Sequence, residues 1–132
     1  MKHNNIIFSF IIALGIFSLQ SCAVTTDDDV VDMEKYVGTW SVSDQSSRLN
    51  YSVSITINPS NSAEILLNNF ADLNSTAVGL VIGNSVVLDS QQLGSGYSVN
   101  GSGSYVNSGK LEFNFSLNDG IDIESRIASF TK

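Results

Sequence analysis

The sequence predicts an all-β protein, an antiparallel up-and-down meander of about eight strands that closes into a small barrel. From Thr39 onward, polar and apolar residues alternate, and Ser, Thr, Val, Ile and aromatic residues are frequent. Turn signals such as Gly83-Asn84 recur at close spacing, and the only proline, Pro59, lies in one of them. A flat meander would leave two exposed edges, and closing it into a barrel removes both.

The predicted strands are short, and most are joined by hairpin-length turns, so strands adjacent in sequence are expected to pair. Two of them alternate most clearly. Residues 49–57 and 110–117 each place four apolar residues on one face: Tyr51, Val53, Ile55 and Ile57 in the first, and Leu111, Phe113, Phe115 and Leu117 in the second. The predicted ranges are 39–43, 49–57, 63–68, 77–82, 85–89, 97–105, 110–117 and 121–131.

The remaining segments carry local signals. Residues 91–93 are assigned to the start of the sixth strand, which Gly94-Ser95-Gly96 interrupts. Gly101 and Gly103 share one face of that strand, a pattern that marks a bend or a close approach of another backbone. In the loop 69–76, Phe70 and Leu73 are candidates to fold back as a plug.

Both ends of the predicted domain also carry signals. Residues 32–37 are predicted to form a short helical turn with Asp32 as its cap. The last predicted strand has an apolar face and a charged face. The apolar face contains Ile121, Ile123 and Ile127, and the charged face contains Asp122, Glu124 and Arg126.

The N-terminus has the features of a lipoprotein signal. After the basic start Met1-Lys2-His3, residues 6–19 form a nearly unbroken apolar run, shorter than the ~18 residues that span a bilayer. The sequence Leu19-Gln20-Ser21-Cys22 resembles the bacterial lipobox, although Gln20 departs from its usual pattern. This resemblance implies cleavage before Cys22 and attachment of lipid to it. The alternatives are an ordinary secretory signal and a buried N-terminal helix.

The acidic cluster Asp27, Asp28 and Asp29 follows the cysteine closely. It resembles the export signal of surface lipoproteins in Bacteroidota, and the alternative is a solvated spacer. We therefore expect an outer-membrane lipoprotein, anchored by its lipid and displayed at the cell surface. The expected organisation is a signal peptide over 1–21, a lipidated cysteine and acidic tether over 22–34, and a barrel domain over 35–132.

Composition excludes several function classes. After cleavage, five cations and thirteen carboxylates give a net charge of −8, and no basic patch suits nucleic acid. His3 is the only histidine and leaves with the signal, while Cys22 would be alkylated. Catalysis by Ser-His-Asp or Cys-His, and zinc sites of His or Cys, are thereby excluded. The scattered carboxylates select no glycosidase pair or calcium loop. We expect no catalytic residue, no metal and no cofactor.

The motif Tyr36-Val37-Gly38-Thr39-Trp40 opens the first strand. Its Gly-x-Trp resembles the lipocalin and wider calycin signature, which implies a lipocalin-like barrel with Gly38 and Trp40 at one end. In that family an Arg from the last strand packs over the Trp, and Arg126 is the matching candidate. Residues 36–132 also resemble the small lipocalin-like lipoproteins of Bacteroidota, although the chain is shorter than a full lipocalin.

Two functions lead, and an enzyme with two carboxylates in a cleft stays as a residual third. The first is a non-enzymatic binding module for a small apolar or amphipathic ligand in the barrel mouth. Tyr51, Tyr97 and Tyr105 are candidate ligand-facing residues, because tyrosine offers an apolar ring and a hydroxyl; the alternative is that they are ordinary strand residues. The second is a protein-interaction or protease-inhibitor-like barrel without a small-molecule pocket. An interior filled by Trp40, Phe113 and Phe115 would oppose the first. We expect a monomer in either case.

Overall fold

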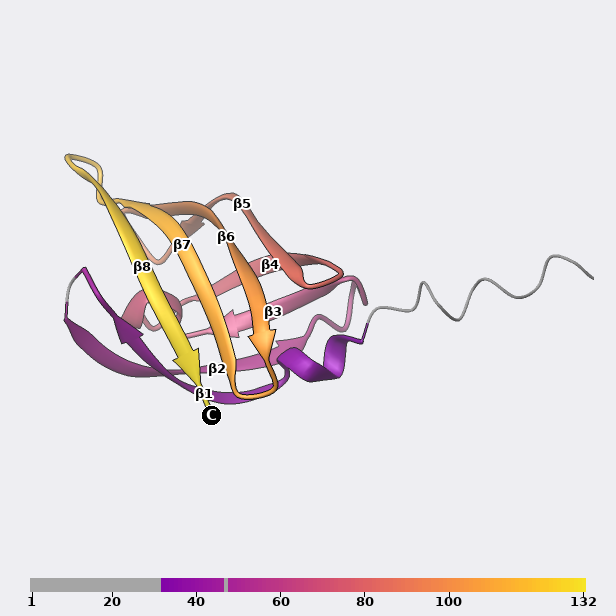
Figure 1. Cartoon of the computed structure of the whole chain (residues 1–132). Coiled ribbons are helices and arrows are strands. Elements are labelled where there is room, and N and C mark those ends of the chain that lie inside the picture. Colours follow the sequence, from indigo (N-terminus) through magenta and orange to yellow (C-terminus); the bar gives the residue numbers. More distant parts are fainter. Residues whose placement is uncertain (1–31, 47) are drawn as a thin grey trace, which may run out of the picture. The chain divides into compact units, whose positions relative to one another are not determined.

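The computed structural model describes residues 32–46 and 48–132, which form a closed barrel of eight antiparallel strands (Figure 1). Each strand pairs with the next along the chain, and the first pairs with the last, so the predicted fold class is confirmed. Cys22 and the acidic cluster 27–29 lie outside the described residues.

The barrel contains eight strands and two short 3₁₀ helices. In chain order they are η3 (Met33–Tyr36), β1 (Gly38–Asp44), β2 (Leu49–Ile57), β3 (Glu64–Asn68), η4 (Phe70–Asp72), β4 (Thr76–Ile82), β5 (Ser85–Leu93), β6 (Tyr97–Asn107), β7 (Lys110–Asn118) and β8 (Ile123–Thr131).

Only β2 keeps its predicted bounds, and the differences that change the assignment of a segment are those in β5 and β8. Residues 91–93 belong to β5 and not to the sixth strand, because a bulge between Leu88 and Gln91 lets β5 continue to Leu93. The last strand begins at Ile123, two residues later than predicted. The Asp119 carboxylate accepts hydrogen bonds from the N–H groups of Ile121 and Asp122 at 2.9 and 2.8 Å, which holds both residues in the turn.

Helix η3 begins before the predicted domain boundary at residue 35. Met33 and Tyr36 are buried in the core, so the last two residues of the predicted tether, 33 and 34, belong to the packed domain. Asp32 occupies the N-cap position, but its side chain makes no capping hydrogen bond.

Alternate residues of each strand face the barrel interior, as expected for a half-buried sheet. The inward rows predicted for β2 and β7 are buried or half-buried, which confirms both. In β8 the inward row is Arg126, Ala128 and Phe130, whereas Ile121, Ile123 and Ile127 are exposed. The isoleucines therefore lie on the outside, because Ala128 and Phe130 are the residues that pair with β1 at Asp44 and Val42.

The glycines of β6 permit close packing against β7. A Cβ added at Gly101 would lie 2.3 Å from the Asn114 carbonyl oxygen, and one at Gly103 would lie 2.4 Å from a ring carbon of Phe113. The predicted close approach of another backbone is thus confirmed at Gly101, whereas Gly103 makes room for the Phe113 ring.

We expect Gly103→Ala to lower the free energy of unfolding by about 1–3 kcal/mol, because the added methyl overpacks the core against Phe113. The control is Ser102→Ala at the exposed neighbouring position, which should change the free energy of unfolding by less than about 0.5 kcal/mol. Urea unfolding measures both values. Equal stabilities of the two variants would contradict the packing argument.

Candidate functional site

Trp40 lies at the end of the barrel that η3 covers. Its side chain is fully buried, and its indole Nε1 donates a hydrogen bond to the Tyr36 carbonyl oxygen at 2.9 Å. The Lys132 Nζ lies 4.5 Å from the centre of the Trp40 ring and donates to the Val37 carbonyl oxygen at 2.9 Å. Gly38 has a φ of +132°, a backbone conformation that favours glycine. A Cβ there would lie only 2.9 Å from Lys132 Nζ, so glycine also leaves room for the lysine side chain.

The cation over Trp40 is therefore Lys132 and not Arg126, which corrects the expectation from the lipocalin resemblance. The register explains the difference. Val42 pairs with Phe130, so residue 132, just past the end of β8, is level with Trp40. Arg126 lies beyond the Asp44–Ala128 pair, toward the opposite end of the barrel.

Tyr36 and Tyr105 pack together at the η3 end. Their ring centres are 5.9 Å apart in an edge-on arrangement, and Lys35 Nζ lies 4.5 Å from the centre of the Tyr105 ring. The Tyr36 hydroxyl donates to the Gly83 carbonyl oxygen at 3.0 Å. Burial, with a contribution from Tyr105, raises the pKa of Tyr36 to about 12, so the phenol stays protonated at neutral pH.

The barrel interior is filled by aromatic and aliphatic side chains. Phe113 and Phe130 stack with ring centres 4.7 Å apart, and Phe70 lies 4.7 Å from Phe115 and 6.0 Å from Phe113. Phe70 is fully buried, and Leu73 packs against the same core. The predicted plug formed by the loop 69–76 is thus confirmed, and it closes the end of the barrel opposite η3.

The plug holds an unusual backbone. Asn69, Ala71, Asp72 and Asn74 all have positive φ values, between 53° and 70°. Asn69 tolerates this region best, and its Oδ1 accepts the N–H of Asn74 at 2.8 Å. Ala71 and Asp72 are strained there at a cost on the order of 1 kcal/mol each. Burial of Phe70 offsets that cost, because a phenylalanine in a core contributes about 3–5 kcal/mol.

A buried ion pair lies near the plugged end. Arg126 Nη1 contacts Asp44 Oδ2 at 3.0 Å, and Arg126 Nε contacts Glu124 Oε1 at 2.8 Å. Asp44 is completely buried, and its Oδ1 also accepts the Ser46 N–H at 3.1 Å. Burial works to lower the pKa of Arg126, but the hydrogen bonds and charges of Glu124 and Asp44 outweigh it and leave the pKa raised.

The three candidate tyrosines do not form one binding face. The Tyr51 hydroxyl is buried and has no hydrogen-bond partner among the described residues; burial raises its pKa, and the Asp44 charge adds to this. Tyr97 lines a polar pocket of about 210 Å³ with Asp119, Asp122 and Arg126. Tyr105 lies eight residues further along β6, about 26 Å away at 3.3 Å per residue.

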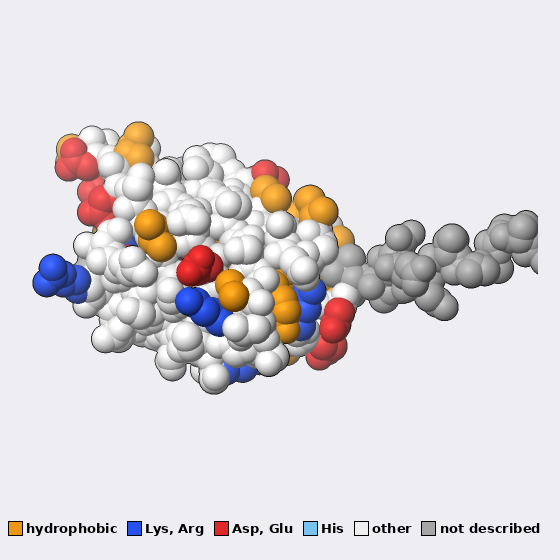
Figure 2. Space-filling model, in the orientation of Figure 1, with side chains coloured by type: hydrophobic (Ala, Val, Ile, Leu, Met, Phe, Trp, Pro, Cys, Tyr) orange, Lys and Arg blue, Asp and Glu red, His pale blue; other side chains and the backbone are white. Residues whose placement is uncertain are grey.

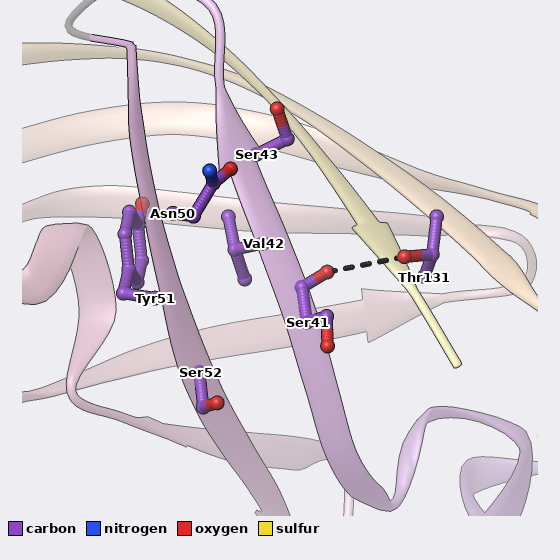
Figure 3. A pocket seen from close by; sticks show the side chains of 7 residues that line it. All are labelled: Ser41, Val42, Ser43, Asn50, Tyr51, Ser52 and Thr131. Atoms are coloured by element: carbon purple, nitrogen blue, oxygen red, sulfur yellow. Dashed lines mark hydrogen bonds between the residues drawn. The ribbon is translucent and has the colours of Figure 1, made fainter.

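The outer surface has a polar side. Figure 3 shows the serines, asparagine and threonine that line a shallow pocket of about 390 Å³ over β1, β2 and the end of β8. In it the Thr131 hydroxyl donates to the Ser41 carbonyl oxygen at 3.4 Å. The pocket offers uncharged hydrogen-bonding groups. The visible side of the barrel over β6, β7 and β8 is also mostly neutral and polar (Figure 2).

A second part of the outer surface is aliphatic. Four residues of β3, β4 and β5 that alternate with buried ones face outward and are half-buried; we call them the aliphatic face: Leu66, Val78, Leu80 and Val87. A shallow groove of about 240 Å³ runs over the face and is lined by Val78, Leu80 and Val87 together with Glu64, Asp89 and Gln91. Figure 2 shows hydrophobic side chains on the right-hand shoulder, in the region of β4 and β5.

The aliphatic face is not among the features predicted from the sequence, although the sequence carries a signal for it. Residues 65–67, 77–82 and 86–88 are continuous apolar runs, whereas β1, β2, β6 and β7 alternate with Ser, Thr or Asn. Continuous runs are typical of strands that are covered on both faces.

We expect Arg126→Met to lower the free energy of unfolding by about 3 kcal/mol, because it removes the cation from a buried carboxylate. Lys110→Met is the control: Lys110 pairs with Glu112 at 3.7 Å on the surface, where such pairs contribute less than about 1 kcal/mol. Chemical denaturation at pH 7 compares the two. A loss for Arg126→Met no larger than the control would contradict a structural role for the ion pair.

The described residues contain no group of three His, Cys, Asp or Glu side chains placed to hold a metal ion. Among the same residues, no helix has the length and apolar character to cross a membrane. Comparison of the chain with protein-family models, with curated proteins and with solved structures finds no match.

Proposed function

We propose that the protein is a lipid-anchored, non-enzymatic binding module. It recognises another protein through the outer surface of its barrel. Its anchor would be Cys22, and the acidic cluster 27–29 would direct it to the outward-facing leaflet of the outer membrane. The apolar run 6–19 and the lipobox-like residues that follow it support this location. Stable anchoring takes more than one acyl chain, which triacylation of the cysteine would supply.

The filled interior favours a protein partner over a small ligand bound inside the barrel. Trp40, Phe113 and Phe130 are each fully buried, and Phe70 blocks the far end. A ligand inside the barrel would have to displace such a side chain, which opposes binding by about 3–5 kcal/mol for one phenylalanine. The outer surface requires no such displacement.

The chemistry of the domain supports a role without catalysis. No histidine or cysteine follows Cys22 in the sequence. The buried charged cluster near the plugged end consists of Asp44, Arg126 and Glu124. Arg126 forms ion pairs with both carboxylates, so the cluster has a structural role.

Trp40 is the only tryptophan and reports directly on the interior. We expect a brominated fatty acid, a contact quencher, to leave the Trp40 fluorescence of the detergent-extracted protein unchanged. The control variant is Tyr36→Ala, which should open a cavity at the η3 end beside Trp40 and make quenching detectable. Saturable quenching of the unaltered protein at micromolar concentrations would instead support the small-ligand function.

The anchor has its own test. We expect Cys22→Ser to move the protein from the membrane fraction to the soluble fraction of its host, because the thiol that carries the lipid is lost. Ser21→Ala, which keeps a small residue before the cysteine, should remain in the membrane fraction with an acylated N-terminus by mass spectrometry. An unmodified Cys22 in the membrane fraction would overturn the proposed anchor.

A further inference from the structure

We propose that the aliphatic face of β3, β4 and β5 is a docking site for a protein surface with an aliphatic centre and Lys or Arg side chains at its edges. The inference rests on the proposed interaction role and adds the face that binds and the chemistry of the partner.

The face is contiguous because its residues are cross-strand neighbours. Leu66 pairs with Val78, and Leu80 pairs with Val87, so the four side chains cover adjacent positions on three strands. Ile82, which is 59% exposed, extends the same outward row of β4 toward the turn before β5. The half-buried aliphatic side chains and the exposed Ile82 form an apolar surface with polar residues at its edge, an arrangement that interaction sites share.

The backbone beneath the face is held in place by an extra link. The pairing of β4 with β5 ends at Leu80 and Val87, and the bulge in β5 follows. Beyond it, the Gln91 side chain bridges the two strands: its Oε1 accepts the Val78 N–H at 2.8 Å, and its Nε2 donates to the Val78 carbonyl oxygen at 2.9 Å. The groove is therefore preformed, and a partner would lose little free energy to ordering it.

The charges around the groove select the partner. Glu64 and Asp89 line it together with Val78, Leu80 and Val87. No Lys or Arg occurs between residues 49 and 109, so β3, β4 and β5 carry carboxylates without a cation. A surface with basic edges would complement these carboxylates, and such complementarity mainly increases the association rate and specificity.

The same charges disfavour a second copy of this chain as the occupant. Two aliphatic faces brought together would place Glu64 and Asp89 of both copies in one interface, with no cation from these strands to pair with them. An anionic lipid surface is disfavoured for the same reason.

A stable interface buries about 800 Å² on each partner, so the aliphatic face would form its centre and the surrounding polar residues its rim.

The exposed isoleucines of the β7–β8 hairpin make a weaker candidate. Ile121 and Ile123 are 89% and 70% exposed, but Ile121 lies in the turn, Ile123 begins β8, and both are next in sequence to Asp122, so they form a small surface bordered by carboxylates. They serve as a comparison surface in the test.

Site-specific photocrosslinking in the host tests the proposal on the full-length, membrane-bound protein. The photoreactive residue p-benzoylphenylalanine replaces Leu80 in one strain, Val87 in a second, Ile123 in a third, and Ser52, on the polar side, in a fourth. We expect a protein adduct from position 80 or 87 at a yield at least tenfold above that from position 52. The crosslinked peptide of the partner should contain aliphatic residues flanked by Lys or Arg.

Charge variants separate the docking site from a nonspecific apolar contact. Asp89→Lys should reduce the adduct from position 80 at least fivefold, whereas Asp122→Lys at the hairpin should leave it within twofold. Thermal unfolding of each purified variant shows that the barrel is intact, and Asp89→Asn provides a milder second variant.

Each other outcome overturns the proposal. An adduct with a second copy of this chain, with lipid, or with a partner peptide lacking basic residues assigns the face a different occupant. An adduct only from position 123 or 52 rejects the aliphatic face but leaves the proposed interaction role in place. No adduct from any of the four positions, together with quenching of Trp40 by a fatty acid, rejects both.

Discussion

Closure of the sheet between β1 and β8 is the constraint on which the other features depend. Four residue pairs join these strands, from Ser41–Thr131 to Asp44–Ala128. Because side chains alternate, this register decides which half of β8 faces inward. It brings Arg126 to the buried Asp44 at one end and Lys132 to Trp40 at the other. A shift of one residue would turn Arg126 outward, move Lys132 out of level with Trp40 and place Ile123 and Ile127 on the inner face.

The closed barrel also fixes what kind of binding is available. Eight strands enclose a space that side chains nearly fill, and here Trp40, Phe113, Phe115 and Phe130 occupy it together with Phe70 from the loop 69–76. Because side chains fill the interior, a partner would contact the outer surface of the barrel. There the strands differ: β1, β2, β6 and β7 present mainly Ser, Thr and Asn, while β3, β4 and β5 present Leu and Val.

Much of this architecture was predictable from the sequence, because alternation and turn chemistry are local signals. The inward rows of β2 and β7, the close backbone approach at Gly101 and the Phe70 plug all followed from residue type and spacing. The partner of Trp40 did not, since it depends on the register across the closing pair and not on the order of cations along the last strand. The aliphatic face was overlooked because three consecutive apolar residues such as 65–67 look like an irregular strand until both faces are seen. The location and the anchor stay predictions, because they depend on residues before 32.

The absence of cations between residues 49 and 109 has a consequence apart from recognition. Proteases that cleave after Lys or Arg find no peptide bond to cut within β2, β3, β4, β5 and β6. Even in a fully opened chain, trypsin-like enzymes would release residues 49–110 as one piece. Such enzymes would therefore leave the whole segment from β2 to β6 uncut, and would separate it from β1 and from most of β7.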